Sequence, residues 1–235
     1  SKGRLITGSL LIAASGFIII SPIGESFSAS LIDKFPSLKT SKGRLITGSL
    51  LIAASGFIII SPIGESFSAS LIDKFPSLKT SKGRLITGSL LIAASGFIVS
   101  SMTLWISNTI SEGAGFCAVN SIISCDDVIG NDDYNKVPMI GIRWAELGVV
   151  VYAFFLWVVM SINKEPNAEW VGSNIKLGFM ASMTGIIAIV WLMYSEYKMS
   201  KICPYCTAAH IANILLIYGF WQMGKLYDSG EWHKQ

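Results

Sequence analysis

Long apolar runs without acidic or basic side chains constrain this chain more than any other feature. A helix that crosses the ~30 Å hydrocarbon layer of a bilayer needs about 20 such residues in succession. Five runs of this kind are clear: Leu5–Gly24, Leu45–Gly64, Leu85–Ser111, Leu177–Ser195 and Ile202–Gly224. A sixth, from about Met139 to Ile162, carries Arg143 and Glu146 near its start and is free of charge afterwards.

The composition agrees with a protein embedded in a lipid bilayer. The chain has 235 residues, of which 51% are hydrophobic and 14% are charged, whereas soluble domains carry about 25% charged residues. Backbone amides in lipid must pair within their own segment, and the runs lack the alternation of a membrane barrel. We therefore expect an all-α integral membrane protein. The net charge of +3 is small, and the basic residues lie at the ends of the runs instead of forming a stripe, which argues against a nucleic-acid partner.

The first 80 residues are an unusual repeat. Residues 1–40 recur unchanged at 41–80, and the first eighteen residues of the unit appear again at 81–98. Repeats normally drift, so this one is either a recent duplication or an error in the assembled gene. Consecutive single-span units insert with opposite orientations, yet each copy has the same basic flank. One copy must therefore lie on the surface, or the helices are frustrated. We expect residues 1–80 to add two apolar segments that the chemistry does not need, and residues 81–235 to form the core.

Four spans remain in this core, at roughly 85–107, 139–162, 174–195 and 202–224. A long first loop and short later ones predict a four-helix transmembrane bundle. The first loop, Ser107–Gly141, is acidic, so we expect it to face away from the cytoplasm. Lys198 and Lys201 would share that side and oppose the assignment.

The four cysteines form two pairs on this same side. Cys117 and Cys125 lie in the acidic loop, and Cys203 and Cys206 form a Cys-Pro-Tyr-Cys motif where the last run begins. Two dithiols are the minimum needed to relay electrons by thiol–disulfide exchange, and a non-cytoplasmic compartment is where disulfides persist. The unpaired amides of a helix start stabilise a thiolate. The alternatives are structural disulfides, or a zinc site with His210 as a further ligand.

The chain resembles the vitamin K epoxide reductase family, and more closely its bacterial and plastid disulfide-forming members, over about residues 81–224. Four elements carry the resemblance in order: Arg84-Leu85 opening a span, Cys117-Ala-Val-Asn-Ser-Ile-Ile-Ser-Cys125, Gly141-Ile142 with Leu147-Gly148 opening the next, and Cys203-Pro-Tyr-Cys206 opening the last. The resemblance implies a four-helix bundle around a quinone. It implies that the motif on the last helix reduces the quinone, while the loop pair receives electrons from a thioredoxin-like partner.

The resemblance also assigns roles to residues. Cys206 is expected nearest the quinone ring, Cys125 exchanges with Cys203, and Cys117 faces the partner. His210, one turn after Cys206 and on the same helix face, is expected to donate to a quinone carbonyl.

Three further expectations follow from the resemblance. Asn131 stands where many relatives have a hydrogen-bonding Ser, and is a second candidate for binding. No thioredoxin-like domain follows, so the partner would be a separate protein. The membrane would be a bacterial inner membrane or a thylakoid, and the quinone a phylloquinone, menaquinone, plastoquinone or ubiquinone.

The other polar residues within the runs have structural interpretations. Arg143 and Glu146 are three residues apart and are expected to pair. Asn213 and Thr184 are expected to make interhelical hydrogen bonds, and tryptophans such as Trp144 to anchor the membrane interface. The acidic residues of the loop lack the spacing of a calcium site.

One alternative function comes from a different class. The chain could be a non-catalytic scaffold subunit of a larger membrane complex, such as a photosynthetic assembly, that retains the bundle. An enzyme requires a quinone-sized apolar cavity beside Cys206, and a scaffold does not. Epoxide reduction also stays open on chemical grounds.

Overall fold

A computed structural model describes residues 41–61, 78, 80–111, 124–131, 133–138 and 140–234. The first copy of the repeat and Cys117 lie outside these residues. The helices are α4 (Ser41–Ile60), α6 (Ser81–Ser111), α7 (Cys125–Ile129), α8 (Trp144–Lys164), α9 (Val171–Met199), α10 (Pro204–Asp228) and a short 3₁₀ helix, η3 (Glu231–Lys234).

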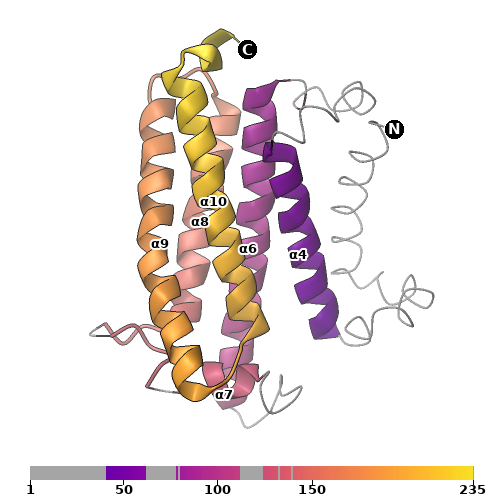
Figure 1. The fold of residues 1–235 in the computed structure, drawn as a ribbon, viewed down its shortest axis with the longest axis vertical. Coiled ribbons are helices and arrows are strands. Elements are labelled where there is room, and N and C mark those ends of the chain that lie inside the picture. The colour runs from indigo at the N-terminus through magenta and orange to yellow at the C-terminus, as the bar shows by residue number, and fades with distance from the viewer. Residues whose placement is uncertain are drawn as a thin grey trace, which may run out of the picture.

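The described part of the chain is helical and contains no β-strand, apart from isolated bridges such as Lys136 with Arg143. The long helices α6, α8, α9 and α10 lie side by side, and α4 packs along the outer side of α6 (Figure 1). The expectation of an all-α protein is confirmed.

Three helices among the described residues are long and apolar enough to cross a bilayer: Ser81–Ile110, Trp144–Lys164 and Val171–Met199. The described part of α4 contributes a shorter apolar helix, Thr47–Ile60. The protein is therefore a membrane protein. Large apolar side chains on the outer faces, such as Ile187 at 74% exposure and Val150 at 65%, are where lipid tails would contact the helices.

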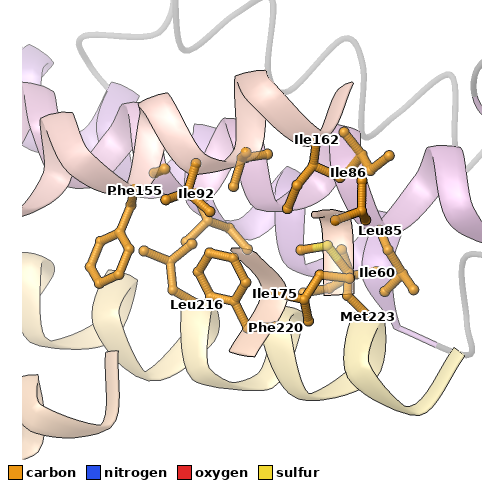
Figure 2. Packing of buried hydrophobic residues seen from close by; sticks show 14 of the residues in the cluster. Ile60, Leu85, Ile86, Ile92, Phe155, Ile162, Ile175, Leu216, Phe220 and Met223 are labelled. Atoms are coloured by element: carbon orange, nitrogen blue, oxygen red, sulfur yellow. The ribbon is translucent and has the colours of Figure 1, made fainter. Parts of the chain in front are cut away.

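The bundle is held by close packing of aliphatic and aromatic side chains from all its long helices. Figure 2 shows Phe155 of α8, Ile92 of α6, and Leu216 and Phe220 of α10 directed toward one another, and all four are fully buried. Phe155 and Phe220 have ring centroids 5.9 Å apart. Because lipid tails are as apolar as these side chains, van der Waals contact stabilises this core more than transfer out of water does.

The second and third copies of the repeat pack against each other through glycines. A Cβ atom on Gly56 or on Gly88 would lie 2.6 Å from the carbonyl oxygen of the other, so neither tolerates a side chain. Gly56 also abuts Ile92, and Gly88 abuts Ile60, which means that α4 and α6 run antiparallel. Identical segments thus have opposite orientations, as the repeat predicted for consecutive copies.

The C-terminus is fastened at one end of the bundle by a buried lysine. Lys82 Nζ donates to the carbonyl of Trp232, 3.0 Å away, and to Asn167 Oδ1, 3.1 Å away. The indole of Trp232 donates in turn to the carbonyl of Pro166 at 2.6 Å. This fastening lies at the opposite end of the bundle from α7 and from the turn between α9 and α10 (Figure 1).

Candidate functional site

The turn between α9 and α10 sets the position of the Cys-Pro-Tyr-Cys motif. Helix α9 ends at Met199, and Ser200 follows in the left-handed conformation with φ 53°. The amide of Lys201 then donates back to the carbonyl of Glu196 at 3.1 Å. Helix α10 begins at Pro204, which needs no amide partner in a first helical turn. The chain reversal places Cys203 at the N-cap of α10.

Cys203 and Cys206 are free thiols whose sulfur atoms lie 2.7 Å apart. Cys203 is fully buried and Cys206 is half-buried. The amide of Cys206 donates to Cys203 Sγ at 3.3 Å, so the sulfur serves as the cap of the helix. Because a disulfide bond is about 2.05 Å long, the pair can close with a small approach of the sulfur atoms.

Glu196 joins this pair, and the sequence analysis did not anticipate it. Its carboxylate oxygen Oε1 accepts the backbone N–H of Cys203 at 3.1 Å. A carboxylate oxygen of Glu196 and the sulfur atoms of Cys203 and Cys206 all lie within 4.8 Å of one another. The available signal was that Glu196 is the first charged residue after the apolar run Leu177–Ser195 and lies seven residues before Cys203.

Helix α7 docks onto the same turn. The amide of Ser124 donates to the carbonyl of Ile202 at 3.3 Å, and Lys201 pairs with Asp127 at 3.0 Å. The hydrogen bond from Lys201, followed by one involving Ser124, lowers the pKa of Asp127 below its ordinary value. Figure 1 shows α7 beneath the bundle, beside the turn between α9 and α10.

This docking brings a loop cysteine to the helix motif. Cys125 is the first residue of α7, is fully buried, and belongs to the same apolar cluster as Cys203 and Tyr205. Cys125 is disulfide-bonded, and Cys117 lies outside the described residues. Because metals bind the thiolate form of cysteine, a disulfide-bonded Cys125 cannot serve as a ligand in the zinc alternative.

A cavity of about 330 Å³ lies beside the motif, and Cys206 contributes to its wall. Helices α6, α8, α9 and α10 supply mostly apolar walls, and α7 and the segment after it add Val128, Ile129, Tyr134 and Asn135. Such a volume is at the lower end of the range for small-molecule sites, which are concave, largely apolar and carry few polar groups. His210 lines the cavity one turn after Cys206, as its spacing predicted.

Two cavity residues carry buried nitrogens that lack a hydrogen-bond partner among the described residues: His210 Nε2 and Trp144 Nε1. Buried polar atoms normally have partners. A quinone offers two carbonyl acceptors on a flat apolar ring, so its chemistry fits both the nitrogens and the walls. The interpretation of Trp144 as an interface anchor overlooked its part in this cavity. The sequence signal was its position at the first residue of α8, on the side of the membrane that holds the cysteines.

Asn131 lies in the turn after α7. Its amide oxygen accepts the backbone N–H of Asp133 at 3.0 Å, and its carbonyl accepts the N–H of Asn135 at 2.8 Å. Asn135, not Asn131, is among the residues that line the cavity. A binding role for Asn131 stays a prediction.

Two of the three predicted partners of polar residues within the apolar runs were right and one was wrong. Arg143 pairs with Glu146 at 3.5 Å, and Asn213 Nδ2 donates across to the carbonyl of Ser182 at 3.0 Å, which confirms both predictions. The Thr184 hydroxyl instead donates to the carbonyl of Ala181 in its own helix at 2.7 Å. A hydroxyl within a helix readily bonds the preceding turn, so the prediction of an interhelical bond was wrong.

Comparison with known proteins agrees with this arrangement. No curated protein and no solved structure matches the chain. The model of the vitamin K epoxide reductase family matches residues 89–221, which contain α7, the cavity and the Cys-Pro-Tyr-Cys motif. The chain therefore belongs to the vitamin K epoxide reductase family.

Proposed function

We propose that the protein is a membrane thiol:quinone oxidoreductase that drives disulfide formation in a separate thioredoxin-like partner. Electrons would enter through Cys117 and Cys125, pass to Cys203 and Cys206, and leave to a quinone. The observation that carries the proposal is the position of Cys206, which is 2.7 Å from Cys203 Sγ and forms part of the wall of an apolar cavity. Family membership supports an oxidoreductase of this type.

The relay consists of successive thiol–disulfide exchanges. A dithiol of the partner reduces the loop disulfide and leaves oxidised. The freed Cys125 thiolate attacks Cys203 in the oxidised motif, so that Cys206 leaves as a thiolate. Attack by Cys117 on the mixed disulfide then restores the loop disulfide and releases Cys203. Two electrons thus pass from the partner to the loop pair and then to the motif. The transfer from the loop pair to the motif is supported by the apolar cluster that Cys125 and Cys203 share.

The cavity residues have distinct tasks in this scheme. A bound quinone supplies an acceptor for two electrons and two protons. Trp144 and His210 would hold its carbonyl oxygens through their ring nitrogens, and an N–H aimed at an oxygen that gains negative charge favours reduction. Apolar walls that include Val151 and Leu192 exclude water from the reacting sulfur.

We also propose that α10 is the fourth span and that the cysteines lie on the non-cytoplasmic side of a bacterial inner membrane or thylakoid. Lys198 and Lys201 opposed this orientation in the sequence. In the structure Lys201 is neutralised by Asp127, and Lys198 Nζ lies 5.5 Å from the centroid of the Tyr194 ring. Both lysines therefore have partners at this end of the bundle.

The scaffold alternative has less support. A scaffold needs neither a cavity at Cys206 nor free thiols at the cap of a helix. The predicted division into residues 1–80 and a core from residue 81 is compatible with either function, and so is a larger membrane complex.

The test is quinone-dependent oxidation of a reduced thioredoxin-like protein by the purified chain in lipid nanodiscs. Ubiquinone, menaquinone, plastoquinone and phylloquinone are supplied in parallel, and quinol formation is followed by absorbance. Wild-type protein is expected to reduce at least one quinone, and Cys206→Ser to fall to the rate without protein. Removal of residues 1–80 is expected to leave the rate within about threefold, because the walls of the cavity come from α6 onward. Wild-type protein that reduces none of the quinones would contradict the proposal.

A further inference from the structure

We propose that Glu196 is the proton acceptor for the Cys203 thiol when the Cys203–Cys206 pair is oxidised. This inference rests on the proposed function for its place in the cycle. The chemistry it describes, closure of a dithiol to a disulfide, can be measured without a quinone.

The position of Glu196 allows it to accept this proton. Glu196 lies one turn before the end of α9, and the backbone N–H of Cys203 holds its Oε1 at 3.1 Å. The same bond fixes the carboxylate beside both sulfurs, since a carboxylate oxygen and the two sulfur atoms lie within 4.8 Å of one another. A proton acceptor must be within hydrogen-bond reach of the proton it removes, directly or through one water. This geometry meets that condition.

The charge of the cluster also favours Glu196 as the acceptor. Cys203 is fully buried and Glu196 is half-buried, so a thiolate formed beside an ionised carboxylate would place two negative charges in a poorly solvated site. Transfer of the thiol proton to the carboxylate avoids this, because the cluster keeps a single negative charge throughout. The position of Glu196 near the end of the helix leaves the carboxylic acid close enough to the membrane surface to release the proton.

Oxidation of the Cys203–Cys206 dithiol by quinone is balanced in atoms and electrons. Both S–H bonds break, the S–S bond between Cys203 and Cys206 forms, and two electrons pass to the quinone. Glu196 takes the Cys203 proton as that sulfur bonds to Cys206, the electron pair displaced from Cys206 passes to the quinone, and Glu196 then releases the proton to water. The Cys206 proton and one proton from water end on the two quinol oxygens, so no proton is gained or lost overall. When the loop dithiol reduces the pair, Glu196 returns a proton to Cys203.

A purely structural role for Glu196 makes a different prediction. If the carboxylate only caps the N–H of Cys203, a glutamine amide oxygen can replace it. Glu196→Gln keeps this acceptor and removes the base, Glu196→Asp keeps a base on a shorter side chain, and Glu196→Ala removes both. Glu146→Gln is the matched control, because Glu146 is a half-buried carboxylate at the same end of the bundle that pairs with Arg143.

The experiment is a quinone-free titration of the full chain in nanodiscs with 5,5′-dithiobis(2-nitrobenzoate), while the loop pair stays oxidised. The first thionitrobenzoate is released when the more accessible Cys206 attacks the reagent. The second is released when Cys203 attacks the resulting mixed disulfide, which is the step assigned to Glu196.

The expected result is a split between the two phases. Glu196→Gln leaves the rate of the first phase within about threefold of wild type and slows the second phase at least tenfold. Glu196→Asp recovers most of the rate of the second phase. Added formate accelerates the second phase of Glu196→Ala. Glu146→Gln behaves as wild type. A second phase at the wild-type rate in Glu196→Gln, or equal slowing of both phases, would overturn the proposal. If wild-type protein reduces no quinone while the split appears, the proposed function fails and the role of Glu196 stands.

Discussion

The hydroxyl of Tyr152 in α8 donates a hydrogen bond to the carbonyl of Ala209 in α10, 2.5 Å away. Ala209 is the residue before His210. Tyr152, Ala209 and His210 all line the cavity. This bond therefore fastens the wall that carries His210 to the helix that carries Trp144. Trp144 and His210, the two described cavity residues with buried, unpartnered ring nitrogens, are held in register by it.

Tyr152→Phe should loosen this wall. The loss of one hydrogen bond costs about 0.5–1.5 kcal/mol, and we expect a lower melting temperature in detergent together with a raised KM for quinone. Tyr194→Phe, on the exposed side of α9, is the control and should change neither quantity. A Tyr152→Phe protein with wild-type melting and KM would remove this bond from the account.

Gly96 provides the space that the Tyr152 ring occupies. A Cβ atom at Gly96 would overlap the ring, so Gly96→Ala must displace Tyr152 or separate α6 from α8, at a cost of about 1–3 kcal/mol. Gly224→Ala is the matched control, since its nearest neighbour would be Ile175 at 3.8 Å. We expect the control to be neutral or to stabilise the helix by about 0.5–1 kcal/mol. Equal melting temperatures for the two variants would show that Gly96 is not a tight contact.

The sequence predicted the helices better than it predicted their ends. The second core span was expected from about Met139, but α8 begins at Trp144. The chain before it is not helical because the backbones of Lys136 and Arg143 pair as an isolated β-bridge and Gly141 turns the chain with φ 74°. Apolar runs indicate which residues prefer lipid, and they do not reveal short-range backbone pairing at the surface. For the same reason, the apolar run Leu177–Ser195 did not predict that α9 continues to Met199 and includes Glu196.

Site residues were predictable where helical spacing alone determined them. His210 follows Cys206 by four residues on one helix, so it had to share its face. Trp144 and Asn135 come to the cavity from another helix and from the loop that precedes it, and only tertiary packing brings them together. The docking of Cys125 beside Cys203 also depends on tertiary contacts, through Ser124 and Ile202.

The Asp127–Lys201 pair should make loop docking sensitive to acid. Because Lys201 lowers the pKa of Asp127 below the ordinary 3.8, the pair stabilises docking fully above about pH 5 and loses this effect as pH falls through the lowered pKa. A partly exposed pair is worth no more than about 1 kcal/mol. Asp127→Asn should therefore speed hydrogen exchange in α7 modestly at pH 7, and its effect should shrink as the pH falls below 3.8. Asp133→Asn is the control, and an effect of Asp127→Asn that persists at low pH would contradict this assignment.

Lys82→Met should release the C-terminal fastening. The substitution leaves the buried carbonyl of Trp232 without the partner that lies 3.0 Å away, and an unsatisfied buried group costs about 1–3 kcal/mol. We expect a lower melting temperature and a larger change in tryptophan fluorescence than for Lys176→Met, which alters an exposed residue of α9. Thiol reactivity at Cys206 should be unchanged, because the fastening lies at the far end of the bundle. Altered reactivity would indicate coupling along α10.

In the proposed function, electrons pass from the loop to the motif through direct exchange between Cys125 and Cys203. This exchange can be tested by mass spectrometry of non-reduced peptides from Cys117→Ser/Cys206→Ser protein, which keeps only these two of the four cysteines, after mild oxidation in nanodiscs. Cys125→Ser/Cys206→Ser serves as the comparison, since it retains Cys117 and Cys203. We expect the peptide linked through Cys125 and Cys203 to predominate in the first protein and a linked peptide to be minor in the second. Two unlinked thiols in the first protein would contradict the relay.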